Sequence, residues 1–139
     1  MSMIIEMLRK HEGVETHAYV DTVGKVTIGV GRNIDKNGGI GLSQREIDYL
    51  LASDVERVEA ELSRAFEWYD SLNDARKDAM MDMCFNMGLP RLSKFKKSLA
   101  AMSNRHYEIA AVEFLDSRWA VQVGQRAITI SEMIRTGEY

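Results

Sequence analysis

The chain has 139 residues, of which 45% are hydrophobic and 28% are charged, as in an ordinary globular protein. This length supports one compact domain with a real core, and the single cysteine, Cys84, excludes an intrachain disulfide framework. The apolar stretch at the N-terminus is too short and too charged for a signal segment or a membrane span. We therefore expect synthesis in a reducing cytoplasm and no stable membrane insertion.

The charge is unevenly distributed, although the net charge is only −3. Residues 43–87 carry five basic and eleven acidic residues, whereas residues 88–139 carry eight basic and five acidic ones. Solvated helix faces usually explain such a pattern, but the segment RLSKFKK (residues 91–97) is also typical of a surface that meets an anionic polymer. The pI of about 5.6 and the absence of a known nucleic-acid motif argue against nucleic acid as a partner.

Along the chain, a short helix is predicted over residues 2–11, because Ile4, Ile5, Met7 and Leu8 crowd one side of it. The helical period is lost between residues 14 and 31. There the segments AYV, DTVG and KVTIGVG predict a strand, a turn and a second strand.

The predicted hairpin has two notable features. Asp21 and Gly24 stand where a hairpin needs turn residues. On the second strand, Thr27, Gly29 and Gly31 share a face that is almost bare of side chains, and such a face opens the backbone to a molecule lying against it.

A long helix is predicted from Ser43 to about residue 62. Ser43 and Glu46 form the pattern of a capping box, and the apolar residues that follow recur at helical spacing in a narrow stripe. Such a helix often bridges two lobes. The loop before it, residues 33–41, is rich in glycine and asparagine.

The rest of the chain is predicted to be helical. One helix ends at Gly88, since Pro90 cannot continue it, and helical runs follow near residues 93–103, 106–116 and 125–134. The methionines are expected to fill the core. Because the strand signal precedes residue 35 and the helix signal follows residue 42, we predict an α+β, predominantly helical fold with a small sheet lobe.

Three residues suggest chemistry. Hydrolysis of a glycosidic bond needs one protonated carboxyl group and a second carboxylate. Glu12 lies at a junction between helix and sheet, where partial shielding is expected to raise its pKa. Asp21 is expected to be more solvated and ionised, and Thr27 to hold a water molecule. This set describes an inverting hydrolase, although spacing alone also fits a turn residue at Asp21 and a plain β-former at Thr27.

The stretch EGVETHAYVDTVGKVTIGVG (residues 12–31) resembles the active-site segment of T-even phage-type lysozymes, glycoside hydrolase family 24. The segments YDSL, FNMG, AAVEF, SRW, QRA and IRTG follow in the order of that family, so the resemblance covers nearly the whole chain. It implies one lysozyme domain with a sheet lobe at about 13–42, a connecting helix at about 43–62, and a helical lobe at about 63–139 on which helix 2–11 packs.

The resemblance also implies roles for individual residues. Glu12 is the general acid, Asp21 activates or orients water, and Thr27 places that water. Arg126 pairs with the catalytic glutamate from the helical lobe. The supporting or substrate-binding positions are Gly31, Phe85 and Asn86, although periodicity alone places Phe85 in the core. We expect no metal and no cofactor.

The implied function is that of an endolysin or muramidase that cleaves the β-1,4 bond between N-acetylmuramic acid and N-acetylglucosamine in peptidoglycan. A monomer is expected to reach the periplasm and wall from the host cytoplasm through a holin lesion. The alternatives are a catalytically weak wall-binding module, a lysozyme domain that acts in phage entry, and membrane disruption by the basic helices. A Cys84–His106 peptidase or amidase is disfavoured, because Cys84 lies in an apolar stripe, where a thiol is inert.

Three departures from the family pattern stand out. Arg32 occupies a position where the family often has histidine, so a histidine ion pair does not transfer. The segment between the hairpin and the long helix is shorter, which predicts a more open cleft on that side. The chain is also net acidic, whereas the T-even protein is strongly basic.

Overall fold

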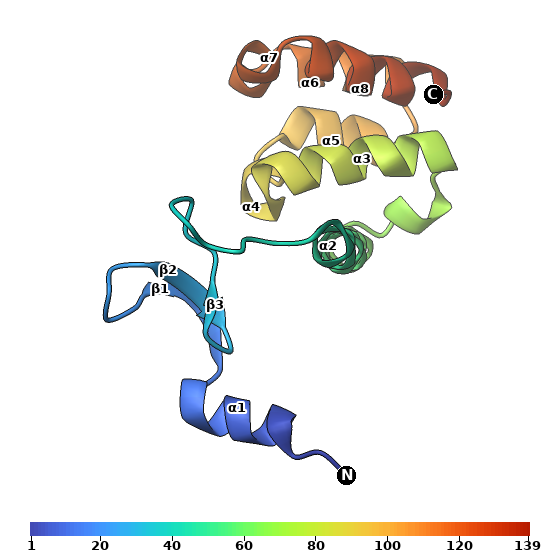
Figure 1. Ribbon diagram of the computed structural model, residues 1–139. Coiled ribbons are helices and arrows are strands. Elements are labelled where there is room, and N and C mark those ends of the chain that lie inside the picture. Colours follow the sequence, from blue (N-terminus) through green and yellow to red (C-terminus); the bar gives the residue numbers. More distant parts are fainter. The chain divides into compact units, whose positions relative to one another are not determined.

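The computed structural model describes residues 1–139, and it contains eight α-helices, one short 3-10 helix and a three-stranded sheet. The chain divides into two compact units, Met1–Leu50 and Leu51–Tyr139 (Figure 1). The boundary falls within α2 (Gln44–Ala65), so this helix contributes to both units. The predicted α+β, predominantly helical fold is confirmed.

The first unit contains α1 (Ile4–Glu12) and an antiparallel sheet of β1 (Glu15–Val20), β2 (Val26–Gly29) and β3 (Arg32–Asn33), in the order β1-β2-β3. The predicted hairpin is therefore present, and β3 extends it. Thr27 lies on the central strand, opposite Tyr19 on one side and Asn33 on the other.

The first unit has no hydrophobic core of its own, since Thr27 is its one buried residue. The sheet does not cover the apolar side of α1, which consists of Ile4, Ile5, Met7 and Leu8. An apolar stripe with no partner in its own unit needs one elsewhere. The packing of this helix on the helical lobe stays a prediction.

The start of α2 shows the predicted capping box. The Ser43 hydroxyl accepts the Glu46 N–H at 3.2 Å, and Glu46 Oε1 accepts the Ser43 N–H at 2.8 Å. Arg32 adds a two-pronged ion pair, with Nη1 2.8 Å from Glu46 Oε1 and Nη2 2.7 Å from Glu46 Oε2. Arg32 Nη1 also donates to the Gly41 carbonyl. Arg32 thus ties β3, the following loop and α2 together.

A low pH is expected to weaken the junction that Ser43, Glu46 and Arg32 form at the start of α2. The pKa of Glu46 is lowered, first by the backbone N–H of Ser43, then by the Ser43 hydroxyl and Arg32. A carboxyl group whose pKa is lower in the folded chain stabilises the fold above the unfolded pKa of about 4.3, and this contribution disappears as the pH falls through the folded pKa. The Ser43 amide NMR shift should therefore titrate with a midpoint below the ordinary glutamate value.

Glu46→Gln is the control for this titration, because the variant has no carboxyl group at position 46 and the Ser43 shift should then stay flat over the same range. A Ser43 midpoint at or above the ordinary glutamate value would contradict the proposed role of the junction.

The second unit contains the hydrophobic core. Its elements after α2 are the 3-10 helix Tyr69–Ser71, α3 (Asp74–Met87), α4 (Leu89–Leu92), α5 (Lys96–Ser103), α6 (Tyr107–Leu115), α7 (Arg118–Val123) and α8 (Gln125–Thr136). Met80, Met83, Met87 and Met102 are buried in this core, as predicted for methionines. None of the helices is both long and apolar enough to cross a lipid bilayer.

Two short helices, α4 and α7, were not predicted. Gly88 ends α3 as expected, but Pro90 then stands in the first turn of α4, where its missing N–H costs nothing. The hydroxyl of Ser117 caps α7 by accepting the Ala120 N–H at 3.1 Å. Helices of four and six residues are too short to show a helical period.

Candidate active site

Glu12 is the last residue of α1, which ends because Gly13 has a φ of 77° and its N–H closes on the Arg9 carbonyl. Glu12 is exposed. The first unit alone therefore does not supply the shielding predicted for this carboxyl group.

One close neighbour of Glu12 in this unit is Gly31, in the turn between β2 and β3. A Cβ atom added at Gly31 would lie 2.7 Å from Glu12 Oε2 and 3.0 Å from Glu12 Cδ. Gly31 also has a φ of +64°, which side chains rarely adopt. The turn thus needs glycine both for its conformation and to leave space for the glutamate.

Gly31→Ala is expected to lower the catalytic activity predicted for Glu12 by about 10- to 100-fold, because the new methyl group displaces the Glu12 carboxyl and a misplacement of about 1 Å can cost 10² in rate. Gly29→Ala is the matched control, since Gly29 has a similar φ of +70° but no atom near its added Cβ. Both variants should lose about 1–2 kcal/mol of stability from the strained φ. Equal activity losses in a turnover assay would show that backbone strain, not Glu12, is responsible.

Asp21 stands at the hairpin turn and is half-buried. Its Oδ1 accepts the backbone N–H of Val23 at 3.0 Å and that of Lys25 at 2.8 Å. Both bonds use the same oxygen, so Oδ2 is left for other partners. Asp21 is therefore the turn residue that its position indicates, and it still offers one carboxylate oxygen for chemistry.

Thr27 is 3% exposed, and its hydroxyl donates to the Lys25 carbonyl at 3.0 Å. A hydroxyl has one hydrogen and two lone pairs, so a hydroxyl that already donates can only accept from a further partner. A water molecule beside Thr27 would thus donate to it. The burial also shows that the glycine-bared face does not leave Thr27 open to solvent.

Lys25 was not predicted from the sequence. Its backbone N–H binds Asp21, and its backbone carbonyl binds Thr27. One residue therefore holds both candidate side chains. No sequence signal could reveal this role, because it uses main-chain atoms that every residue except proline has.

Two predicted residues of the second unit lie on α3. Phe85 is 48% exposed and lines a cavity of about 280 Å³ beside Met81 and Asp82, so the core position indicated by periodicity is wrong. Asn86 Oδ1 accepts the indole N–H of Trp119 at 2.9 Å, and this bond fixes the position of a buried tryptophan.

Arg126 lies in the first turn of α8 and donates through Nε to Asp82 Oδ1 at 2.7 Å. Its two terminal nitrogens have no partner within the second unit. Its predicted pairing with Glu12, which belongs to the first unit, stays a prediction.

Cys84 is a free, buried cysteine, and burial raises the pKa of its thiol. A nucleophilic cysteine needs the opposite shift, because the thiolate is the reactive form. The structure thus supports the predicted structural role of Cys84 and not the peptidase alternative with His106.

The first unit thus carries one carboxyl group at the end of a helix, a second at the hairpin turn and a hydroxyl on the central strand, and most glycosidases work with a pair of carboxyl groups. The comparisons with known proteins identify the kind of glycosidase. The phage lysozyme family model matches residues 9–133, so the chain belongs to the phage lysozyme family and is a glycoside hydrolase of the lysozyme type, with peptidoglycan as its substrate.

Three similar proteins illustrate the range of the family. The chain is 30% identical to probable T4-type lysozyme 2 of Dictyostelium discoideum, over 99% of this chain and 96% of that protein. It is also 30% identical to the pre-baseplate central spike protein Gp5 of Enterobacteria phage T4, over 99% of this chain but 28% of that protein. The identity to the endolysin of Salmonella phage P22 is 32%, over 80% of this chain and 77% of that protein.

Proposed function

We propose that the chain hydrolyses the β-1,4 bond between N-acetylmuramic acid and N-acetylglucosamine with inversion at the anomeric carbon. The observation that carries this proposal is the shared anchoring of Asp21 and Thr27 on Lys25. A water molecule between these two side chains donates one hydrogen to Asp21 Oδ2 and the other to Thr27 Oγ1. One of its lone pairs then faces the sugar.

The proton transfers of the proposed reaction balance. Glu12 gives its proton to the leaving glycosidic oxygen as the C–O bond breaks, while Asp21 takes a proton from the attacking water as the new C–O bond forms. Glu12 ends as a carboxylate and Asp21 as an acid, and solvent exchanges their protons before the next turnover. No group from the protein becomes bonded to the sugar.

We further propose that both units act as one lysozyme domain, with helix α1 packed on the helical unit and the terminal nitrogens of Arg126 paired with Glu12. A monomer would serve host cell lysis, reaching the wall from the cytoplasm through a holin lesion. The similarity to the phage T4 spike protein Gp5 keeps phage entry as the alternative role.

Mass analysis of the fragments that the pure protein releases from peptidoglycan tests the proposed reaction. Hydrolysis at the proposed bond gives fragments with a reducing N-acetylmuramic acid end. Each of these fragments is heavier by one water molecule than the same fragment with an anhydro end. Anhydro ends would indicate a transglycosylase-type reaction, and reducing N-acetylglucosamine ends would indicate a different bond.

Arg126→Ala is expected to reduce activity about tenfold, less than the loss of Glu12 itself, because a charge-assisted hydrogen bond contributes about 1.5–3 kcal/mol. Two variants separate this effect from the loss of a surface ion pair. Asp82→Asn breaks the Arg126–Asp82 pair but keeps the guanidinium, and Arg135→Ala breaks the comparable pair with Glu132 on the same helix.

Both control variants should keep near wild-type rates in a turbidity assay on permeabilised cells. Equal losses in all three variants would mean that Arg126 acts only on stability.

A further inference from the structure

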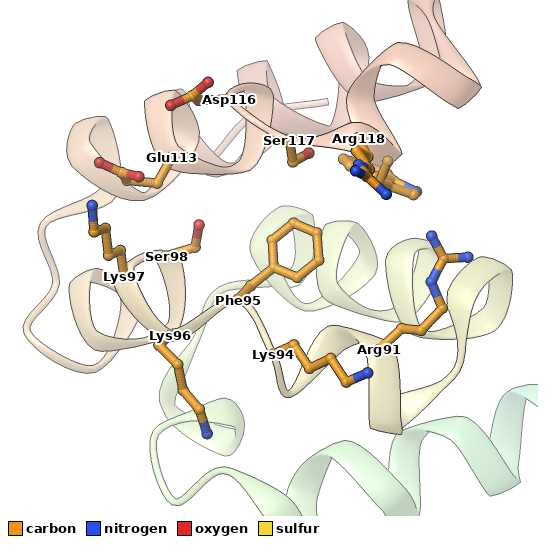
Figure 2. A pocket seen from close by; sticks show the side chains of 11 residues that line it. Arg91, Lys94, Phe95, Lys96, Lys97, Ser98, Glu113, Asp116, Ser117 and Arg118 are labelled. Carbon is orange, nitrogen blue, oxygen red and sulfur yellow. The ribbon is translucent and has the colours of Figure 1, made fainter.

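A second site is indicated by a pocket in the helical unit, distinct from the residues of the proposed reaction. The pocket encloses about 710 Å³ and is lined from α4, α5, α6 and α7 and the segments between them (Figure 2). Its lining contains five cationic side chains, which are Arg91, Lys94, Lys96, Lys97 and Arg118, and only two acidic ones, Glu113 and Asp116.

The five cations form no ion pair within the protein. None of them has a carboxylate oxygen within 4.0 Å, although the chain as a whole is acidic and forms ion pairs elsewhere. Of the five, Arg91 alone forms a side-chain hydrogen bond, in which its Nη2 donates to the side-chain oxygen of Gln122 at 3.4 Å. Unpaired cations gathered around one cavity repel each other unless an anion lies between them.

The two ends of the pocket differ in charge. In Figure 2, Glu113 and Asp116 lie toward the same end as Lys97, whereas Arg91 and Arg118 lie toward the other end. The arginine end is therefore the one suited to an anion. Guanidinium groups also match the oxygens of an oxyanion in two-pronged geometry.

The start of α5 also contributes to the lining of the pocket. Ser98 lines the pocket and is 2% exposed. It lies in the first turn of α5, where N–H groups have no acceptor within the helix. The positive end of a helix dipole favours an anion.

Part of the pocket wall is held by aromatic packing and a hydrogen bond. The Trp119 indole N–H is bound by Asn86, and the ring of Phe95 packs edge-on against Trp119 with 6.5 Å between the centroids. Both aromatic residues line the pocket. Preorganised walls of this kind keep the ordering cost of binding low.

We propose that this pocket binds phosphate ester groups of an anionic polymer of the bacterial envelope, in addition to the glycan that the enzyme cleaves. Phosphate suits the combination of arginines, a helix start and a buried hydroxyl, because it offers several acceptor oxygens in a tetrahedral arrangement. A polymer with a phosphate in each repeat unit also contacts the lysines around the rim of the pocket. Trp119 is only 2% exposed, so its ring offers no open face on which nucleic-acid bases could stack.

Calorimetric titration of the whole chain with a soluble poly(glycerol phosphate) tests the proposal without using the catalytic activity. Arg91→Gln and Arg118→Gln are each expected to weaken binding about tenfold, and Ser98→Ala should weaken it by a smaller factor. Arg45→Gln and Arg64→Gln remove exposed arginines outside the pocket and should change the affinity less than twofold. Binding should weaken as salt is added.

Three other anionic ligands serve as comparisons in the same titration. Poly-glutamate of equal charge, single-stranded DNA and vesicles of anionic phospholipid should each bind at least tenfold more weakly than the polyol phosphate. Equal or tighter binding of any of these would overturn the assignment in favour of a carboxylate polymer, nucleic acid or a membrane. Equal losses of affinity in the pocket variants and the control variants would overturn the assignment of the site. Thermal melting checks that each variant is folded.

Discussion

Replacing Glu12 by glutamine is expected to reduce the rate of peptidoglycan hydrolysis by roughly 10² or more, the usual scale of general acid catalysis. Glutamine keeps the shape of the side chain but has no proton that it can transfer to the leaving oxygen. Turbidity clearing of permeabilised cells and release of reducing ends from purified wall measure this loss. The melting temperature should stay close to that of the wild type, because Glu12 is exposed and forms no hydrogen bond or ion pair in the first unit.

The same variant separates the classes of function that the sequence leaves open. Lysis that survives Glu12→Gln would indicate membrane disruption by the basic helices and not hydrolysis. A wild-type protein that binds purified wall but releases no reducing ends would be a wall-binding module. Gly29→Ala is a useful comparison, since it perturbs the same unit without contact to Glu12.

The sequence was sufficient to predict the features that depend on local chemistry. The capping box of Ser43 and Glu46, the turn at Asp21 and the end of α3 at Gly88 each need particular residue types at fixed spacing. These residues form their bonds within a few positions of themselves. Long helices with a clear period were predicted within a few residues of their ends.

The features that depend on tertiary structure could not be predicted in this way. Phe85 has the spacing of a core residue, yet it is 48% exposed and does not belong to the core of the second unit, and periodicity does not say which side a helix buries. Lys25 organises Asp21 and Thr27 through its backbone, and no side-chain pattern marks that role. The sequence does not indicate which group Arg32 pairs with, and only the structure reveals its partner, Glu46.

Thr27→Glu is expected to have the other large effect, because it changes the course of the reaction. In the proposed mechanism a water molecule fills the space between Asp21 and Thr27, and the two catalytic carboxyl groups stand about 6.5–9.5 Å apart to admit it. A glutamate at position 27 puts a carboxylate in the place of that water. It should then attack the sugar itself, and either trap it covalently at position 27 or convert the enzyme to retention.

Proton NMR of freshly released sugar ends distinguishes these outcomes. The wild type should release the α-anomer first, since inversion at a β-linkage gives α, and Thr27→Glu should give either the β-anomer or a protein whose mass is increased by the bound saccharide. Thr27→Val is the control, because it keeps the branched shape but removes the acceptor oxygen, and it should be slow and still inverting. Thr27 is buried, so a charged side chain there lowers stability, and each variant is measured below its melting temperature. A β-anomer from the wild type would mean that Asp21 attacks the sugar directly, and the shared anchoring on Lys25 would then orient a nucleophile and not a water molecule.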